Sequence, residues 1–167
     1  WNTGNGAPDA ICFSVDHPGI SIAGATVYGG FGNEWSYDLE LLEYQGNDVT
    51  VWPKLVDNDR IYRDIQGYHW LLIDFVRGTY TINDKSDVSE IKFQKPIPIK
   101  ENVKYAIRFR NFGTRTNNGD LGLTNVQGPD GTNFTFSDCP LGFNGTNHIR
   151  GQIPQILYYS SPFPSHS

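Results

Sequence analysis

The chain has 167 residues, of which 38% are hydrophobic and 19% are charged, enough for one domain with a sizeable core. A formal net charge of −5 argues against nucleic acid as the main partner, because phosphate binding usually requires a basic surface. The sequence has no run of about 18 apolar residues and no basic-then-apolar leader, so we expect neither membrane insertion nor a signal peptide within it.

The first half of the chain alternates apolar and polar residues, the pattern of half-buried strands. Residues 11–15 and 20–28 are predicted to be strands, and residues 16–19, which contain proline and glycine, are predicted to join them as a hairpin. Residues 35–41 alternate most clearly. Residues 45–67 are polar and irregular, so we expect a loop or insertion there, with a short helical turn around Ile61 and Ile65.

The second half continues the same alternation. Further strands are predicted over residues 69–75, 91–93, 103–109 and 152–159. Pro96 and Pro98 cannot donate to a sheet ladder, which predicts an edge or crossover segment. Residues 128–131 predict a turn between strands at residues 123–126 and 133–136. Many short strands with almost no helix indicate an all-β protein, an antiparallel β-sandwich. Its predicted core includes Tyr37, Leu39, Ile73, Ile107 and Phe109.

Basic residues cluster in one stretch of this acidic chain. Seven lie between Lys92 and Arg115, with only Glu101 against them. Three of these share the outer face of one predicted strand: Lys104, Arg108 and Arg110. The cluster is either a local positive patch or a set of solvated strand faces, as charge runs usually are.

The residue types that carry out catalysis are not grouped in this sequence. Cys12 and Cys139 are too few for a disulfide framework or a cysteine-rich zinc site, so we expect reduced thiols. The four histidines have no metal-binding spacing, and no nucleophile elbow or phosphate-binding loop is present. We therefore predict no metal, no cofactor and no catalytic residue, although a pair of carboxylates brought together by folding stays open.

One glycine- and asparagine-rich segment, residues 110–120, is the candidate binding site. Arg115 offers a planar fork of donors, Asn117 both donates and accepts, and Asp120 accepts hydrogen bonds. These three residues are predicted to contact a protein partner, with possible neighbours at Gly29, Gly30 and Arg150. The alternative is an ordinary solvated turn that needs glycine and asparagine for positive φ.

Several long motifs carry a resemblance to a known family. Asp-Ala-Ile-Cys-Phe-Ser-Val-Asp stands at residues 9–16, and Thr-Arg-Thr-Asn-Asn-Gly-Asp stands at residues 114–120. Further matching stretches are residues 18–20, 27–30, 100–105, 144–147 and 150–159. Together they resemble the PHR domain of the Pam/Highwire family of giant ubiquitin ligases, and favour the first of its two PHR copies. Residues 45–67 depart from the family pattern, so nothing is transferred to them.

The resemblance implies a compact β-sandwich that recruits protein partners and does not itself catalyse. In the family, ubiquitin transfer belongs to a separate zinc-binding module, and the whole ligase acts in the cytoplasm of neurons in synapse formation and axon growth. We accordingly expect a monomeric domain from a much larger protein, as the first residue, Trp1, and the lack of methionine also indicate.

A carbohydrate-binding sandwich is the alternative function. Aromatic residues make up 14% of the chain, and tryptophans could stack on sugar rings. The candidates are Trp35, Trp52 and Trp70. Most aromatic residues fall on alternating apolar faces, so core packing explains them first.

Overall fold

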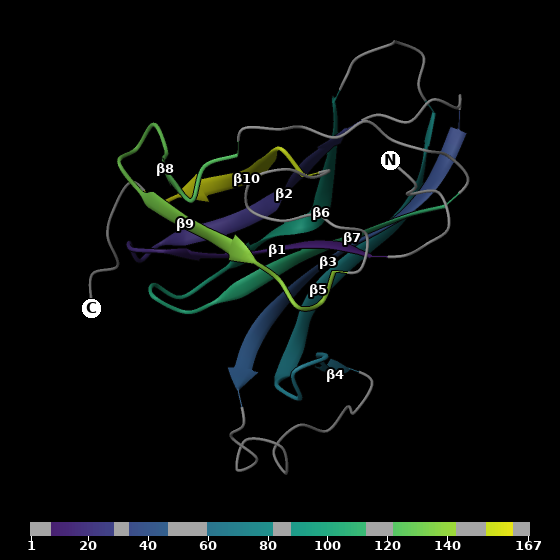
Figure 1. Cartoon of the computed structure of the whole chain (residues 1–167). Coiled ribbons are helices and arrows are strands. Elements are labelled where there is room, and N and C mark those ends of the chain that lie inside the picture. Colours follow the sequence, from purple (N-terminus) through teal and green to yellow (C-terminus); the bar gives the residue numbers. More distant parts are fainter. Residues whose placement is uncertain are drawn as a thin grey trace.

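The computed structural model describes residues 8–28, 34–46, 60–81, 88–112, 122–142 and 153–161, and these ranges contain strands and turns but no α-helix (Figure 1). The strands are β1 (Asp9–Val15), β2 (Ile20–Tyr28), β3 (Glu34–Gly46), β4 (Ile61–Arg63), β5 (His69–Thr81), β6 (Val88–Pro98), β7 (Tyr105–Phe112), β8 (Asn125–Gln127), β9 (Asn133–Asp138) and β10 (Gln155–Ser160).

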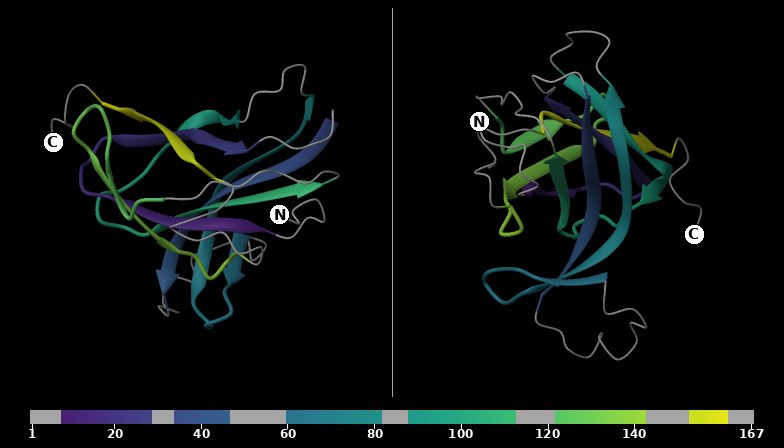
Figure 2. Two further views of the ribbon diagram at one scale, coloured as in Figure 1. Left: turned by 45° about the horizontal axis from the view of Figure 1, so that its top comes forward. Right: turned by 90° about the vertical axis from the view of Figure 1, so that its right-hand side faces the viewer.

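The strands form two packed antiparallel sheets (Figures 1 and 2). The large sheet has seven strands in the order β4-β5-β3-β7-β1-β9-β8, and the small sheet has three in the order β10-β2-β6. Neighbouring strands in both sheets pair antiparallel. The predicted all-β sandwich is therefore confirmed. The strand that contains Pro96 and Pro98, β6, lies at an edge of the small sheet, also as predicted.

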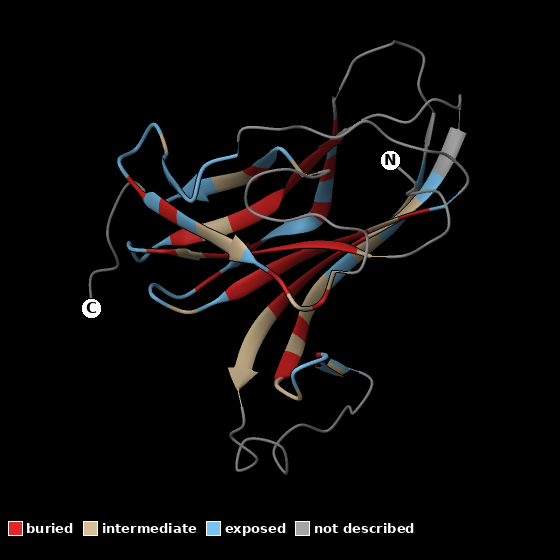
Figure 3. Cartoon of the chain, viewed as in Figure 1, coloured by how far each residue is buried: buried red, intermediate tan, exposed pale blue. Residues whose placement is uncertain are grey.

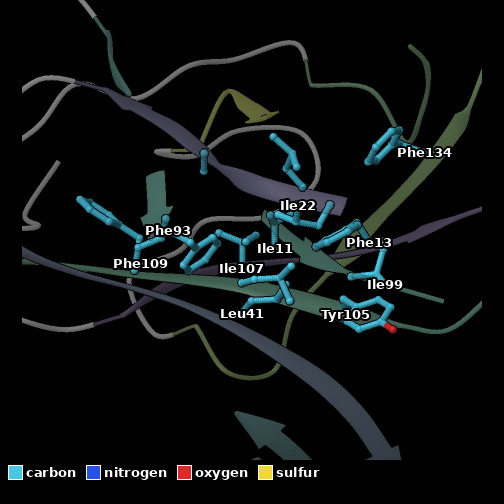
Figure 4. Packing of buried hydrophobic residues seen from close by; sticks show 14 of the residues in the cluster. Ile11, Phe13, Ile22, Leu41, Phe93, Ile99, Tyr105, Ile107, Phe109 and Phe134 are labelled. Atoms are coloured by element: carbon cyan, nitrogen blue, oxygen red, sulfur yellow. The ribbon is translucent and has the colours of Figure 1, made fainter. Parts of the chain in front are cut away.

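The main core fills the space between the two sheets (Figures 3 and 4). Leu39, Ile107 and Phe109 are fully buried in it, as their alternation predicted. Tyr37 and Ile73 are partly buried and pack against this core. The inward faces of β3 and β7 were thus correctly predicted.

The predicted first hairpin is wrong, because β1 and β2 belong to different sheets. Residues 16–19 carry the chain across the sandwich, and the Gly19 carbonyl there accepts a hydrogen bond from the Ser161 amide at 2.9 Å. Gly19 has a φ of 82°, which suits glycine. β1 and β2 each bury one face in the main core. Their apolar and polar residues therefore alternate in the same way whether the two strands pair in one sheet or face each other from two sheets.

A second core covers part of the outer face of the large sheet. It contains Leu42, Trp70, Leu72 and Leu141. Along β5, the alternation of Leu71, Ile73 and Phe75 predicts a single apolar face. This prediction is wrong, because Phe75 is 42% exposed, whereas Trp70 and Leu72 of the other set are buried. Two facts account for the difference: this end of the sheet is covered on both faces, and a register shift between Leu41 and Leu42 inverts the alternation.

The helical turn expected around Ile61 and Ile65 is also wrong, since residues 61–63 form β4 and pair with β5. Asp64 then closes the turn between these strands by accepting hydrogen bonds from the Tyr68 amide at 3.1 Å and from the Trp70 indole at 2.9 Å. The turn thereby satisfies the N–H group of the buried Trp70 indole. Residues 47–59 lie outside the described residues, and the rest of the expected loop stays a prediction.

The predicted hairpin around residues 128–131 is confirmed as β8 and β9, with the Gly131 amide bonded to the Gly128 carbonyl at 3.0 Å. Its turn is tied to the small sheet. Asp130 accepts from the Tyr158 hydroxyl at 2.5 Å and from the Thr132 hydroxyl at 2.7 Å. These bonds hold the pKa of Asp130 well below its ordinary value. Burial and the bond to Asp130 raise the pKa of Tyr158 to about 12.

The hydrogen bond between Tyr158 and Asp130 should make the stability of the folded domain depend on pH. Because folding lowers the pKa of Asp130, its hydrogen-bonded carboxylate stabilises the fold fully at a pH above the ordinary aspartate pKa. This stabilisation is lost as the pH falls below that pKa. Tyr158→Phe should therefore lower the melting temperature at pH 7, by an amount that shrinks as the pH approaches 2. Thermal melts of both proteins across this range test the expectation. Tyr159→Phe, on a more exposed neighbouring ring, is the control. A difference that stays constant with pH would contradict it.

Candidate functional site

The residues predicted to form the partner site all lie outside the described residues. They are Gly29, Gly30, Arg115, Asn117, Asp120 and Arg150. Their role in partner binding stays a prediction, and the described strands show only where the connections that carry them leave the sandwich.

Those connections leave from one end of the molecule. Within the small sheet, β2 ends near the place where β10 begins, because Thr26 lies opposite Gln155. Figure 1 and the left-hand view of Figure 2 show β2 and β7 running towards this same end. The glycine pair follows β2, Arg115 follows β7, and Arg150 precedes β10. The fold is thus compatible with a single site built from all three segments.

An ion-pair network lies on the outer face of the large sheet. Arg108 donates to a Glu40 carboxylate oxygen at 2.7 Å, and Arg110 donates to the same oxygen at 3.4 Å. Glu40 and Arg108 are buried, and the Arg108 guanidinium lies 4.5 Å from the centre of the Tyr62 ring. Of the two alternatives for the basic stretch, a solvated strand face therefore does not apply to Arg108. Its partner lies 68 residues earlier in the chain, a pairing that local alternation does not reveal.

Cys12 and Cys139 are free thiols, buried in the second core. The hydrogen bond to Cys139, together with burial, raises the pKa of the Cys12 thiol, which disfavours the nucleophilic thiolate. Among the described residues, no group of three or more histidine, cysteine, aspartate or glutamate side chains could hold a metal ion. The same part of the chain contains no helix with the length and hydropathy of a membrane span.

One of the three tryptophans considered for sugar stacking can be placed. Trp70 is 1% exposed, and its indole nitrogen donates to Asp64. Its face is therefore occupied by the second core. The side chains of Trp35 and Trp52 lie outside the part of the chain that is described.

Comparison with known proteins identifies relatives along almost the entire chain. The family model described as the PHR domain matches residues 1–159. The E3 ubiquitin-protein ligase MYCBP2 of Danio rerio is 49% identical over 170 residues, covering 98% of this chain and 3% of that protein. The E3 ubiquitin-protein ligase highwire of Drosophila melanogaster is 47% identical over 164 residues, covering 97% of this chain and 3% of that protein. This chain belongs to the PHR domain family.

Proposed function

We propose that this domain is a non-catalytic module that recruits protein partners for a large ubiquitin ligase. The observation that carries the proposal is the match to two proteins named E3 ubiquitin-protein ligases, in each of which the aligned region is 3% of the length. A region of that size fits one module among many. Its cellular setting, as the family resemblance implies, is the cytoplasm of neurons during synapse formation and axon growth.

The partner site lies at the end of the sandwich where β2 and β7 finish and β10 starts. Loops mounted on rigid strands are the usual place for binding residues, since the strands hold their ends in place. Arg115 supplies a donor fork for a partner carboxylate or carbonyl, and Asn117 and Asp120 supply the complementary donor and acceptors. Gly29, Gly30 and Arg150 flank this site from the neighbouring connections.

Arg115→Ala is expected to weaken partner binding roughly thirtyfold, the effect of losing one interface hot spot of about 2 kcal/mol. The melting temperature should hardly change, because a surface truncation typically costs about 0.5 kcal/mol or less. Affinity purification from neuronal extract with the wild-type and variant domains should identify partners retained only by the wild type. Binding of one purified partner then gives the ratio of dissociation constants.

Lys92→Ala is the matched control, because this exposed basic residue lies on β6 of the small sheet. It should retain the same partners as the wild type. If Arg115→Ala also retains all of them at unchanged affinity, the segment is an ordinary turn and the site lies elsewhere. If the variant binds less but also melts at a much lower temperature, Arg115 shapes the domain and is not a contact residue.

A further inference from the structure

Three adjacent strands of the large sheet bring arginines and carboxylates together in rows. On the face turned away from the main core, Asp38 on β3 lies opposite Arg77 on β5 and Arg110 on β7. In the next row, Glu40 lies opposite Phe75 on β5 and Arg108 on β7. Phe112 on β7 lies opposite Ser36, in the row nearest the end of the sandwich where β7 finishes. We call the following residues the arginine face: Asp38, Glu40, Phe75, Arg77, Arg108, Arg110 and Phe112.

Much of this face is open to solvent. Phe75 is 42% exposed, Phe112 is 41% exposed, and the Arg77 side chain is 72% exposed. Farther along the same face, Leu42 and Trp70 are covered by the second core. The open area therefore has a boundary, and two exposed phenylalanines lie at opposite corners of it. The Arg77 guanidinium lies over the Phe75 ring, 5.1 Å from its centre, so a charged group and an apolar ring are presented together at one of these corners.

Hydrogen-bond donors outnumber acceptors here, since three guanidiniums share two carboxylates. Asp38 is engaged by Arg77 at 3.4 Å, and Glu40 is engaged by Arg108 and Arg110. The Arg108 side chain is 5% exposed, yet its Nη2 atom has no hydrogen-bond partner among the described residues. Arg108 itself is enclosed, so the donors open to an added carboxylate are those of Arg77 and Arg110, whose side chains are 72% and 29% exposed. The arginine face has one more positive than negative side chain, although the whole chain carries a formal net charge of −5.

We propose that the arginine face docks an extended segment of a protein partner in which an acidic residue lies between two apolar residues. Phe75 and Phe112 are on strands either side of β3 and four residues apart along it, which places them about 16 Å from each other. In an extended peptide, side chains two or four positions apart point to the same face, and four positions span about 14 Å, close to that distance. Its apolar side chains contact the two phenylalanines, and its carboxylate contacts Arg77, which is more exposed than Arg110. Because the ligand is a protein segment, this surface rests on the partner-recruiting role proposed above.

The probes are fluorescein-labelled twelve-residue peptides with two leucines four positions apart and one glutamate midway between them, alongside identical peptides carrying glutamine instead. Fluorescence anisotropy with the full chain should show binding of the glutamate peptides, and about tenfold weaker binding of the glutamine peptides, the loss expected for a charge-assisted hydrogen bond. Arg77→Gln and Phe112→Ser should each weaken binding of the glutamate peptides about tenfold. Lys92→Gln, exposed on the small sheet, should leave it unchanged.

Both Arg77 and Phe112 are exposed, so their variants should melt close to the wild-type temperature. Equal affinity for glutamate and glutamine peptides, or no binding of either at about 1 mM, would overturn the arginine face as a docking surface. A loss caused by Arg115→Ala and not by Arg77→Gln would also overturn it, while supporting the loop site. Failure of the recruiting role itself would be seen separately, as no protein partner retained by the wild-type domain in the affinity purification.

Discussion

Glu40→Ala is expected to lower the free energy of unfolding by about 3–5 kcal/mol, the usual cost of removing one partner from a buried ion pair. Glu40 and Arg108 are 7% and 5% exposed in their side chains and lie 2.7 Å apart. Without the carboxylate, the Arg108 guanidinium stays buried with its charge uncompensated. Urea denaturation of both proteins measures the difference, provided that the slope with denaturant is unchanged.

The same sheet provides a matched control. Arg77 pairs with Asp38 at 3.4 Å, but the Arg77 side chain is 72% exposed. Arg77→Ala should therefore cost less than about 1 kcal/mol, as exposed ion pairs do. Replacing Glu40 and Arg108 together by leucine should recover much of the loss, because no buried charge remains. If Glu40→Ala costs no more than Arg77→Ala, the Glu40 carboxylate does not compensate a buried charge.

Strand positions could be predicted where apolar residues alternate with polar ones and the register is regular. Ile107 and Phe109 alternate with polar residues along β7, and both are fully buried. Leu39 on β3 follows the same rule. In such strands a period of two reports directly which side chains point into the core. The fold class follows from many strands of this kind with glycine- and proline-rich turns between them.

Pairing and the second buried face could not be predicted in this way. Glu40 and Arg108 lie on neighbouring strands but 68 residues apart, so nothing local indicates that their charges meet. β1 and β2 are joined by four residues yet lie in different sheets. On β5, Trp70 and Leu72 are buried by residues on the opposite side from the main core. Each case depends on contacts between distant segments, which alternation does not encode.

The candidate site could be predicted only as chemistry. The sequence indicates that Arg115, Asn117 and Asp120 have complementary donors and acceptors. It does not indicate that the segments after β2, after β7 and before β10 share one end of the sandwich, because this follows from strand order and direction. The arginine face was missed for a related reason: its arginines and carboxylates come from three strands and meet only through their register.

Phe109→Ala should lower the free energy of unfolding by about 3–5 kcal/mol, as truncation of large buried aromatic residues does. Phe109 has no exposed surface, and it lies between Leu39 on β3 and Asp9 on β1 in the middle of the large sheet. Figure 4 shows it in the layer between the sheets, where Phe93 of the small sheet also lies. Alanine leaves a cavity that the surrounding strands cannot close, because both sheets hold their spacing through backbone hydrogen bonds.

Phe112→Ala is the matched control, since it removes the same ring from the same strand at a position that is 41% exposed. It should cost less than about 1 kcal/mol, because less apolar area is lost from the interior and no closed cavity forms. Urea denaturation of the two variants, measured side by side, gives the contrast directly. Equal costs would mean that β7 does not turn Phe109 towards the small sheet. The face that carries Phe112 would then not be the outer one, and the arginine face would lose its exposure.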